Sequence, residues 1–534
     1  MQHRRAGRPK SRNGCSTCKY VVQTDFLEVS STNIGRARHV RCDEERPACG
    51  QCVSTGRKCD GYNPGITQKQ LHENVLAAYQ HRVPPNSDNR IAVYQGTPEE
   101  REYVHTFCTL TSPVFSGFFA SELWDHLLPQ LSHTEPAVRH AITAVAAAHR
   151  RYIAGSQGSE EEFILQQYNR AIRVLVDGHL STAQRTGTSQ PNLTLVNCCL
   201  FACLEMLHSN HQQALDHIDA GLQLMWQDQS ARRGPGNLPI LDIELWELFC
   251  RLHMDLAMFG RRTWPSVVGS EEVHIPRSFS DITQSRRILT KLMNKTMIAS
   301  SNTNLQPLLL HPDMRGHDPE FMQSQRELMT HQSLYTAWSD TFNRFLQTRQ
   351  GKTADQRSVL ALRIDHHFAI LWTLSTTAVN ETEYDRYDAY FEDLVCMAEG
   401  LLRLERSAHN SVSEIRPFCP EPGVLRALQL TATKCRDPLL RREALRIMSD
   451  HPRKESVWDW KRSVRLGKLF TRVEEAELRD LPVKRRVPGE RNRIVHYQLW
   501  DNWEASETRV QLWLWSDWSR RELSCSVETV DWSS

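Results

Sequence analysis

Six of the chain's fifteen cysteines lie in its first sixty residues, and their spacing constrains the fold more than any other feature of the sequence. From the third cysteine onward the spacing is C-x6-C-x2-C-x6-C, and the first two cysteines repeat the two-residue step. The gap between the second and the third cysteine breaks this regularity, because it holds 23 residues. The six residues are Cys15, Cys18, Cys42, Cys49, Cys52 and Cys59.

Clustered cysteines at two-residue spacing are typical of metal sites in a reducing compartment, where disulfides are rare. The opening MQHRRAGRPKSRNG lacks the apolar run of a secretory signal, and no run of about 18 apolar residues could span a bilayer. We therefore expect a soluble intracellular protein without a membrane partner. Zinc binds four ligands in a tetrahedron. Six thiolates satisfy two zinc ions if two sulfurs bridge both ions; a chance cluster of cysteines is the alternative.

The six cysteines, together with Pro47, resemble the fungal binuclear zinc cluster of transcription factors. That family's pattern is C-x2-C-x6-C, a loop that contains proline, and C-x2-C-x6-C, and the resemblance covers about a tenth of this chain. It implies two zinc ions as the cofactor, with Cys15 and Cys49 as bridging ligands and the other four cysteines each on one ion. It also implies a nuclear location and double-stranded DNA as a partner.

Residues 20–36 form an anomalous insert in this motif. Their removal leaves six residues between Cys18 and Cys42, which is the family's spacing, and one interpretation is a short intron translated in frame. Lengthening the gap from 6 to 23 residues costs about 1.2 kcal/mol of closure entropy. Structural zinc binding contributes roughly 10 kcal/mol or more. We therefore expect zinc binding to tolerate the insert, whereas the first helix of the motif would be severed.

Four basic residues beside the first three cysteines are candidate DNA contacts, because the major groove admits a helix and distinguishes all four base pairs. By the resemblance, His39 falls at the position that reads guanine in a CGG-like triplet. The other three would contact phosphates and part of the base edge, which fixes the register on the duplex. A merely solvated basic face is the alternative. The four residues are Lys19, Arg38, His39 and Arg41.

The basic charge of the chain is concentrated at its N-terminus. The first 62 residues carry twelve Lys and Arg against six Asp and Glu, although the whole chain has a net charge of only +2. We interpret residues 1–14 as a basic disordered tail, with a phosphate-tracking arm and a nuclear import signal as alternatives. Residues 63–100 are predicted to be a linker with a short helix. Leu71 and Ala78 make a single heptad step there, so a homodimer is a candidate partner without a predicted coiled coil.

From about residue 100 the apolar residues recur at helical spacing with few strand signals, so we predict a mainly α fold in which the small two-zinc module precedes a large all-helical domain. Helical segments are predicted at 136–153, 161–180, 193–225 and 241–260, with Pro136 in a first turn. Loops are predicted at 181–192, 229–239 and around 300–318. Residues 476–534 are predicted to be a poorly defined tail, and the late tryptophans are assigned to the core or to this tail. They are Trp500, Trp503, Trp513, Trp515 and Trp518.

Residues 101–475 resemble the fungal-specific transcription factor regulatory domain through two diffuse motifs. The resemblance implies control of the DNA-binding module, the transcription machinery as a partner, and a small-molecule effector that the sequence does not name. The first motif contributes Leu123, Trp124, Glu135, Pro136, Val138, Arg139, His140 and His149. The second contributes Leu204, Glu205, Ala214, Leu215, His217, Gly221 and Leu222.

The other nine cysteines are scattered and are interpreted as mostly buried free thiols. Glu205, His208, His211 and His217 lie close together on a helical stretch, but surface or capping roles are favoured over a metal site. No phosphate-binding glycine loop, nucleophile elbow or paired-carboxylate motif occurs, so we predict no enzyme. The predicted function is a nuclear, zinc-dependent, sequence-specific regulator of genes transcribed by RNA polymerase II. The alternative is a helical interaction or sensor protein whose interrupted zinc module no longer reads DNA.

Overall fold

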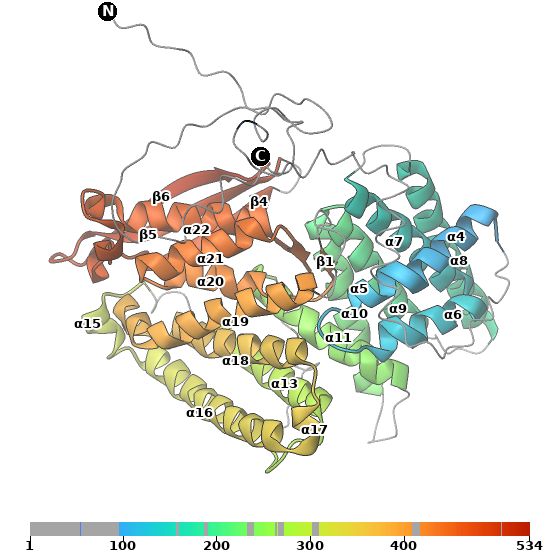
Figure 1. Cartoon of the computed structure of the whole chain (residues 1–534), viewed down its shortest axis with the longest axis horizontal. Helices are drawn as coiled ribbons and strands as arrows, with labels where there is room; N and C mark the ends of the chain where they lie inside the picture. The colour runs from blue at the N-terminus through green and yellow to red at the C-terminus, as the bar shows by residue number, and fades with distance from the viewer. Residues whose placement is uncertain are drawn as a thin grey trace, which may run out of the picture. The chain divides into compact units, whose positions relative to one another are not determined.

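The computed structural model describes Ser54 and residues 96–533, with gaps at 156–159, 186–190, 232–239, 262–263, 265–271, 302–308, 408–416 and 503–504. The chain divides into two compact units, Met1–Asn74 and Val75–Ser534. Apart from Ser54, the described residues all belong to the second unit. Its secondary structure is mainly helical, as predicted (Figure 1).

The described residues in the first part of this unit form mainly α- and π-helical segments. They are α4 (Pro98–Thr106), η1 (Phe107–Thr111), α5 (Ser112–Phe115), η2 (Leu123–Leu127), α6 (Leu128–Thr134), α7 (Pro136–Ala154), α8 (Glu161–Arg185), α9 (Pro191–Leu207), α10 (His211–Ala231) and α11 (Ile240–Met258). Local side-chain and backbone interactions define the ends of several of these helices. Thr97 and Glu100 form a capping box at the start of α4. Pro136 begins α7, and Gly155 ends it in the left-handed conformation.

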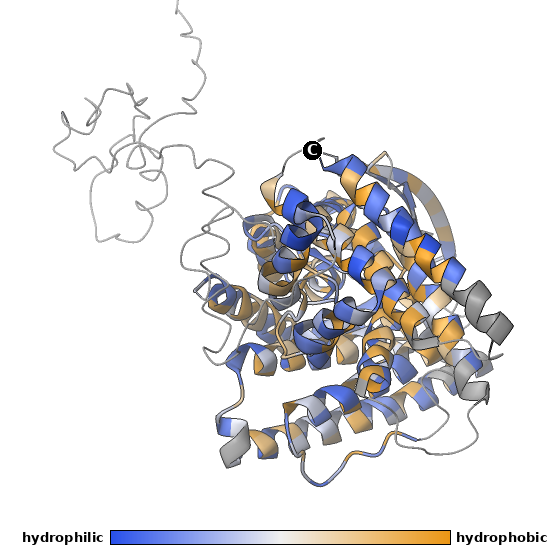
Figure 2. Ribbon diagram, turned by 90° about the vertical axis from the view of Figure 1, so that its right-hand side faces the viewer, coloured by the Kyte–Doolittle hydropathy of each residue, from blue (hydrophilic) through white to orange (hydrophobic). Residues whose placement is uncertain are grey.

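The middle of the unit contains the longest helix and its neighbours. The elements are α13 (Ile282–Ser301), α15 (Pro312–Arg315), α16 (Pro319–Gln347), α17 (Arg349–Lys352), α18 (Gln356–Thr377), η3 (Glu381–Tyr387) and α19 (Asp388–Ser407). Asp318 and Asp355 cap α16 and α18 through their carboxylates. Helices such as α7 and α19 are amphipathic, and hydrophobic residues line one side of many helices in this unit (Figure 2). These apolar faces pack into one large core.

The last part mixes helices with strands. Its elements are β1 (Phe418–Cys419), α20 (Leu425–Lys434), α21 (Pro438–Asp450), β2 (Lys454–Glu455), β3 (Trp458–Asp459), α22 (Trp460–Glu474), η4 (Ala476–Leu478), η5 (Val483–Arg485), η6 (Glu490–Asn492), β4 (His496–Asn502), β5 (Glu507–Asp517) and β6 (Glu522–Asp531). Strand β2 pairs in parallel with β1 and antiparallel with β3. Glu421 lies between β1 and α20 and forms ion pairs with Arg251 of α11 and Arg286 of α13. These ion pairs hold the start of α20 beside α11 and α13.

The C-terminal segment corrects one prediction: residues 476–534 are not a poorly defined tail, because they contain three strands. Strands β4, β5 and β6 form an antiparallel sheet in chain order, with a register shift near Trp515. The sheet packs on α22 through a second apolar cluster that includes Phe470, Ile494 and Leu512. The physical reason is alternation along β5, where every second side chain from Thr508 is buried as far as Leu512.

The cysteines of this unit are predicted to be mostly buried, and its late tryptophans to lie in the core or in the tail; the structure shows burial for some of each. All nine cysteines outside the N-terminal cluster are free, and most are at least partly buried, although Cys396 and Cys525 are exposed. Trp515 is buried, whereas Trp500 is 47% exposed. Trp503 lies outside the described residues.

Candidate functional site

The ten residues that the sequence assigns to zinc and DNA lie outside the described residues, so their placement stays a prediction. The donor chemistry itself fits the metal, because thiolate sulfur is a preferred ligand of zinc and CxxC pairs are typical of structural zinc sites. The residues are the thiolates Cys15, Cys18, Cys42, Cys49, Cys52 and Cys59 and the basic side chains Lys19, Arg38, His39 and Arg41.

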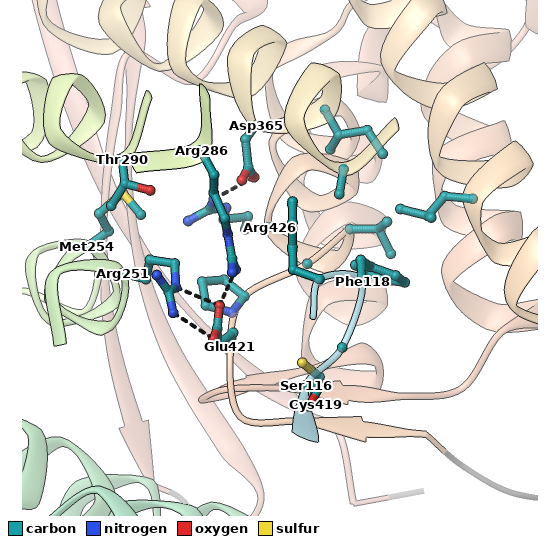
Figure 3. Close-up of a pocket in the computed structure, with 18 residues that line it drawn as sticks. Ser116, Phe118, Arg251, Met254, Arg286, Thr290, Asp365, Cys419, Glu421 and Arg426 are labelled. Carbon is teal, nitrogen blue, oxygen red and sulfur yellow. Dashed lines mark hydrogen bonds and ion pairs between the residues drawn. The ribbon is translucent and has the colours of Figure 1, made fainter. Parts of the chain in front are cut away.

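Within the described part of the chain, a cavity of about 30 Å³ lies where several elements of the large unit converge. The segment after α5, helices α11, α13, α18 and α19, and the segment from β1 to α20 all contribute to its wall (Figure 3). A volume of this size holds roughly two or three water molecules. The cavity is therefore too small for a drug-sized ligand.

One wall of the cavity is an ion cluster around Glu421. Arg251 donates from Nε to Glu421 Oε2 at 2.7 Å and from Nη2 to Oε1 at 3.0 Å, which is a bidentate pair. Arg286 donates to the same Oε2 from the other side. Figure 3 shows Arg251 and Arg286 both directed at this carboxylate. Because α11, α13 and the loop after β1 meet here, the cluster ties together segments that are far apart in the sequence.

The cluster's electrostatics follow from burial and from one carboxylate shared by two guanidinium groups. Burial raises the pKa of Glu421, but the attraction of Arg251 and Arg286 outweighs burial and lowers it overall. Burial lowers the pKa of Arg251, yet Glu421 and Glu247 raise it overall. For Arg286 burial and repulsion from Arg251 prevail, so its pKa is lowered. Arginine nevertheless stays charged.

The second ion pair of the cavity joins α20 to α18. Arg426 donates from Nη2 to Asp365 Oδ1 at 2.6 Å, and its guanidinium lies 4.9 Å from the centre of the Phe368 ring. The side chain of Arg426 is only 1% exposed. Cys419, at the end of β1, also lines the cavity, and burial followed by repulsion from Glu421 raises the pKa of its thiol to about 12. This thiol therefore stays protonated at neutral pH.

The histidine-rich stretch has structural contacts. His217 Nε2 and the Tyr168 hydroxyl are 3.0 Å apart, and Asn210 donates to Glu205 at 2.8 Å. His211 is fully buried, which departs from the predicted surface role. Burial lowers its pKa well below the usual value, with further lowering from Lys454 and Arg462. Across the described ranges, no group of three or more His, Cys, Asp and Glu side chains is placed to hold a metal ion.

Sequence reasoning missed the arginines of the cavity. A usable signal was present, because Arg251 and Arg426 each lie in a largely apolar helical run, in LFCRLHMDL and in VLRALQL. A lone charge on an apolar helix face is rarely buried unless it is paired. Its partner, however, lies up to 170 residues away in the sequence, and spacing along the chain does not identify it.

Two family models match the chain. The fungal Zn(2)-Cys(6) binuclear cluster domain matches residues 36–69, and the fungal specific transcription factor domain matches residues 101–238. The first match contains Cys42, Cys49, Cys52 and Cys59 and begins at the last residue of the insert. The second match covers α4 to α10.

Several curated proteins are similar to the chain. The aspercryptin biosynthesis cluster-specific transcription regulator atnN of Emericella nidulans is 23% identical over 87% of this chain and 88% of the relative. The transcription regulator lscL of Purpureocillium lilacinum is 24% identical over 40% of this chain and 55% of the relative. The Zn(2)-C6 fungal-type transcription factor afumD of Aspergillus fumigatus is 24% identical over 37% of this chain and 48% of the relative.

No solved structure shows a significant match to the chain. In the described part of the molecule, no helix is both long enough and apolar enough to cross a membrane. The matched cluster domain binds zinc and DNA, and the relatives are named as regulators of transcription. The chain therefore carries a fungal Zn(2)-Cys(6) cluster domain and a fungal specific transcription factor domain, as the sequence predicts, and these domains and relatives indicate a transcription factor and not an enzyme.

Proposed function

We propose that the chain is a nuclear regulator of RNA polymerase II genes that holds two zinc ions in its six-cysteine cluster and reads CGG-like triplets in double-stranded DNA. The observation that supports this most directly is the C-x6-C-x2-C-x6-C spacing from Cys42 to Cys59, which lies within the matched cluster domain. Cys15 and Cys49 bridge the ions, and the other four cysteines each bind one ion. The Emericella nidulans relative is named as a cluster-specific transcription regulator, which supports action at specific genes.

DNA reading is assigned to the basic residues between the second and third cysteines. His39 donates to a guanine acceptor in the major groove. Lys19, Arg38 and Arg41 bind phosphates and part of the base edge, which positions the helix. In this proposal, residues 101–475 form the regulatory domain, and the transcription machinery and a second copy of the chain are its partners.

The insert favours a second candidate function. With residues 20–36 present, Lys19 is separated from Arg38, His39 and Arg41, and the match to the cluster domain leaves out Cys15 and Cys18. The long form then acts as a helical interaction or sensor protein whose zinc module no longer reads DNA. Transcript sequencing across codons 19 to 37 decides which form the cell makes.

Metal content tests the cluster. We expect the full chain without residues 20–36 to hold two zinc ions, and Cys49→Ala to disturb both, because a bridging sulfur serves both ions. Cys525→Ala is the matched control, since Cys525 is a free, exposed thiol of the large unit, and it should leave the zinc content unchanged. A content of one zinc ion, or none, in the shortened chain would refute the two-ion cluster.

A duplex titration tests DNA reading in the long and short forms at one salt concentration. We expect the short form to prefer a CGG-containing duplex over a scrambled one by about 4 kcal/mol or more, and the long form to bind both at the non-specific level. His39→Ala in the short form should cost roughly 1 to 3 kcal/mol on the specific duplex, whereas Arg41→Ala should weaken binding to both duplexes alike. Equal discrimination by the two forms would mean that the reading helix is elsewhere.

A further inference from the structure

The cavity beside Glu421 is lined by more cationic than anionic side chains. Arg251, Arg286 and Arg426 face it together with two carboxylates, those of Glu421 and Asp365. Their side chains are mostly removed from solvent, with Arg426 at 1% and Arg286 at 17% exposure. A buried charge is costly unless it is paired and hydrogen-bonded. With three guanidinium groups and two carboxylates in the lining, one buried positive charge has no carboxylate of its own there.

The guanidinium group of Arg426 is only partly hydrogen-bonded. Its Nη2 donates to Asp365, but among the residues that the structure describes, neither its Nε nor its Nη1 makes a hydrogen bond. Asp255, outside the cavity lining, also attracts Arg426, but burial raises the pKa of Asp255 to about 6. The compensation from Asp255 therefore weakens in mildly acidic solution. Arg426 thus lines a cavity with a nearly fully buried guanidinium group, and two donors of that group make no hydrogen bond.

The surroundings of these donors are built for a charged group. The Arg286 guanidinium lies 3.8 Å from the centre of the Phe119 ring, which is a cation–π contact. Figure 3 shows Arg286 between Glu421 and the pair of Asp365 and Arg426, so the guanidinium groups converge. The segment that carries Phe118 and Phe119 lies between η1 and η2, which are π-helical. Such segments occur often at functional sites.

We propose that this cavity binds a small oxyanion, a carboxylate or a phosphate group, through Arg426 with Arg286 beside it. Charge-assisted hydrogen bonds from arginine suit both chemistries. The volume of about 30 Å³ limits the occupant to a few heavy atoms, the size of acetate or inorganic phosphate. The anion links the segment after α5 to α13 and α20. This inference does not depend on DNA reading, because it concerns the large unit alone.

Calorimetric titration of the full chain at pH 7 tests the site, with acetate and inorganic phosphate as separate probes against a chloride background of equal ionic strength. We expect saturable binding of at least one probe with a dissociation constant of about 1 mM or tighter. Arg426→Lys keeps the charge but loses the guanidinium donors, so it should weaken binding by about tenfold or more. Arg446→Lys is the matched control on the solvent-exposed side of α21 and should leave binding unchanged.

A second variant protects the test against misfolding of Arg426→Lys. Ala361, on α18, lines the cavity, and Ala361→Val adds volume there without changing any charge. It should weaken binding as well, while circular dichroism and zinc content stay those of the natural chain. Whichever of acetate and phosphate saturates identifies the chemistry of the occupant. The proposal is overturned if neither probe binds saturably, or if folded Arg426→Lys or Ala361→Val binds with unchanged affinity.

Discussion

Glu474 is the residue of the large unit whose replacement should destabilise it most clearly. Its side chain has no solvent exposure and lies between two buried guanidinium groups, at 2.8 Å from Nη2 of Arg436 and 2.8 Å from Nη1 of Arg441. The backbone N–H of Ile494 also donates to it at 2.9 Å. Burial raises the pKa of Glu474, but the two arginines outweigh burial and lower it overall. Glu474 is therefore an ionised carboxylate that compensates two buried cations.

Glu474→Gln keeps the shape of the side chain and removes its charge. Breaking a buried ion pair costs about 3–5 kcal/mol, because the remaining charge is left uncompensated. The unit Val75–Ser534 is about 460 residues long, and unfolding entropy scales with length, so 1 kcal/mol corresponds to roughly 1 °C in the unfolding midpoint. We expect Glu474→Gln to lower the midpoint of thermal unfolding by about 3–5 °C at pH 7.

The matched control is Glu477→Gln on η4, three residues further on. Glu477 is 64% exposed at its side chain and lies 3.7 Å from Arg491, so its replacement should change stability by less than about 0.5 kcal/mol. Both variants are compared with the natural chain by circular dichroism during heating. A Glu474→Gln midpoint within 1 °C of the control would refute the reasoning.

The pH dependence of stability gives an independent check of the ion pairs between Glu474 and the two arginines. The folded pKa of Glu474 lies below the unfolded value of about 4.3, so its stabilisation is complete above that value and is lost as pH falls through the folded pKa. The difference in midpoint between the natural chain and Glu474→Gln should therefore be constant from pH 7 to 5 and shrink below about pH 4. A difference that grows with acidity would contradict the assigned charge.

Three further outcomes follow from the structure and the sequence. Gly221→Ala should destabilise the large unit by about 1–3 kcal/mol, because the added Cβ would lie 2.2 Å from the buried ring of Phe249. Gly400→Ala should instead stabilise it by about 0.5–1 kcal/mol, because the added Cβ would lie in ordinary contact, 3.9 Å from Leu360 Cδ1, in the helix α19. Thermal unfolding scans distinguish the two signs. Asp501→Asn should lower the urea midpoint by weakening the buried bidentate pair with Arg462 that fastens the C-terminal sheet to α22, and an unchanged midpoint would show that the apolar contacts suffice. The DNA affinity of the chain without residues 20–36 should fall steeply with salt, since phosphate contacts release counterions; a salt-independent affinity would exclude that mode.

The helices were accessible from the sequence because their determinants are local. Pro136 begins α7 as predicted, and α11 closely follows the predicted segment 241–260. The predicted helical stretch 193–225 is two helices, α9 and α10, because the chain turns at Ser209, which has a φ of +64°. Glycine commonly indicates a turn with positive φ, whereas serine rarely adopts this conformation. The sequence pattern therefore did not indicate that the helix ends before Ser209.

The C-terminal sheet and the cavity were missed for different reasons. The alternation along β5 was present in TRVQLWLW, but the apolar run LWLW at residues 512–515 places apolar side chains on both faces and so obscured the period of two. The cavity depends on pairs such as Arg251 with Glu421 and Arg426 with Asp365, whose partners come from distant elements. Such pairs are set by how helices pack, and no spacing rule along the chain encodes them.

The N-terminal insert separates two properties that the uninterrupted motif combines. Zinc binding requires only that the thiolates meet, and a longer loop allows this at a small entropic cost. In the proposed mode of base reading, Lys19 and His39 project from one short helix, where without the insert they are three residues apart, or about 4.5 Å along the axis. With residues 20–36 present they are twenty residues apart, and metal ligation at Cys18 and Cys42 does not restore their register. A chain that retains its metal can therefore lose its discrimination between base pairs, and zinc content alone is not a measure of DNA-reading competence.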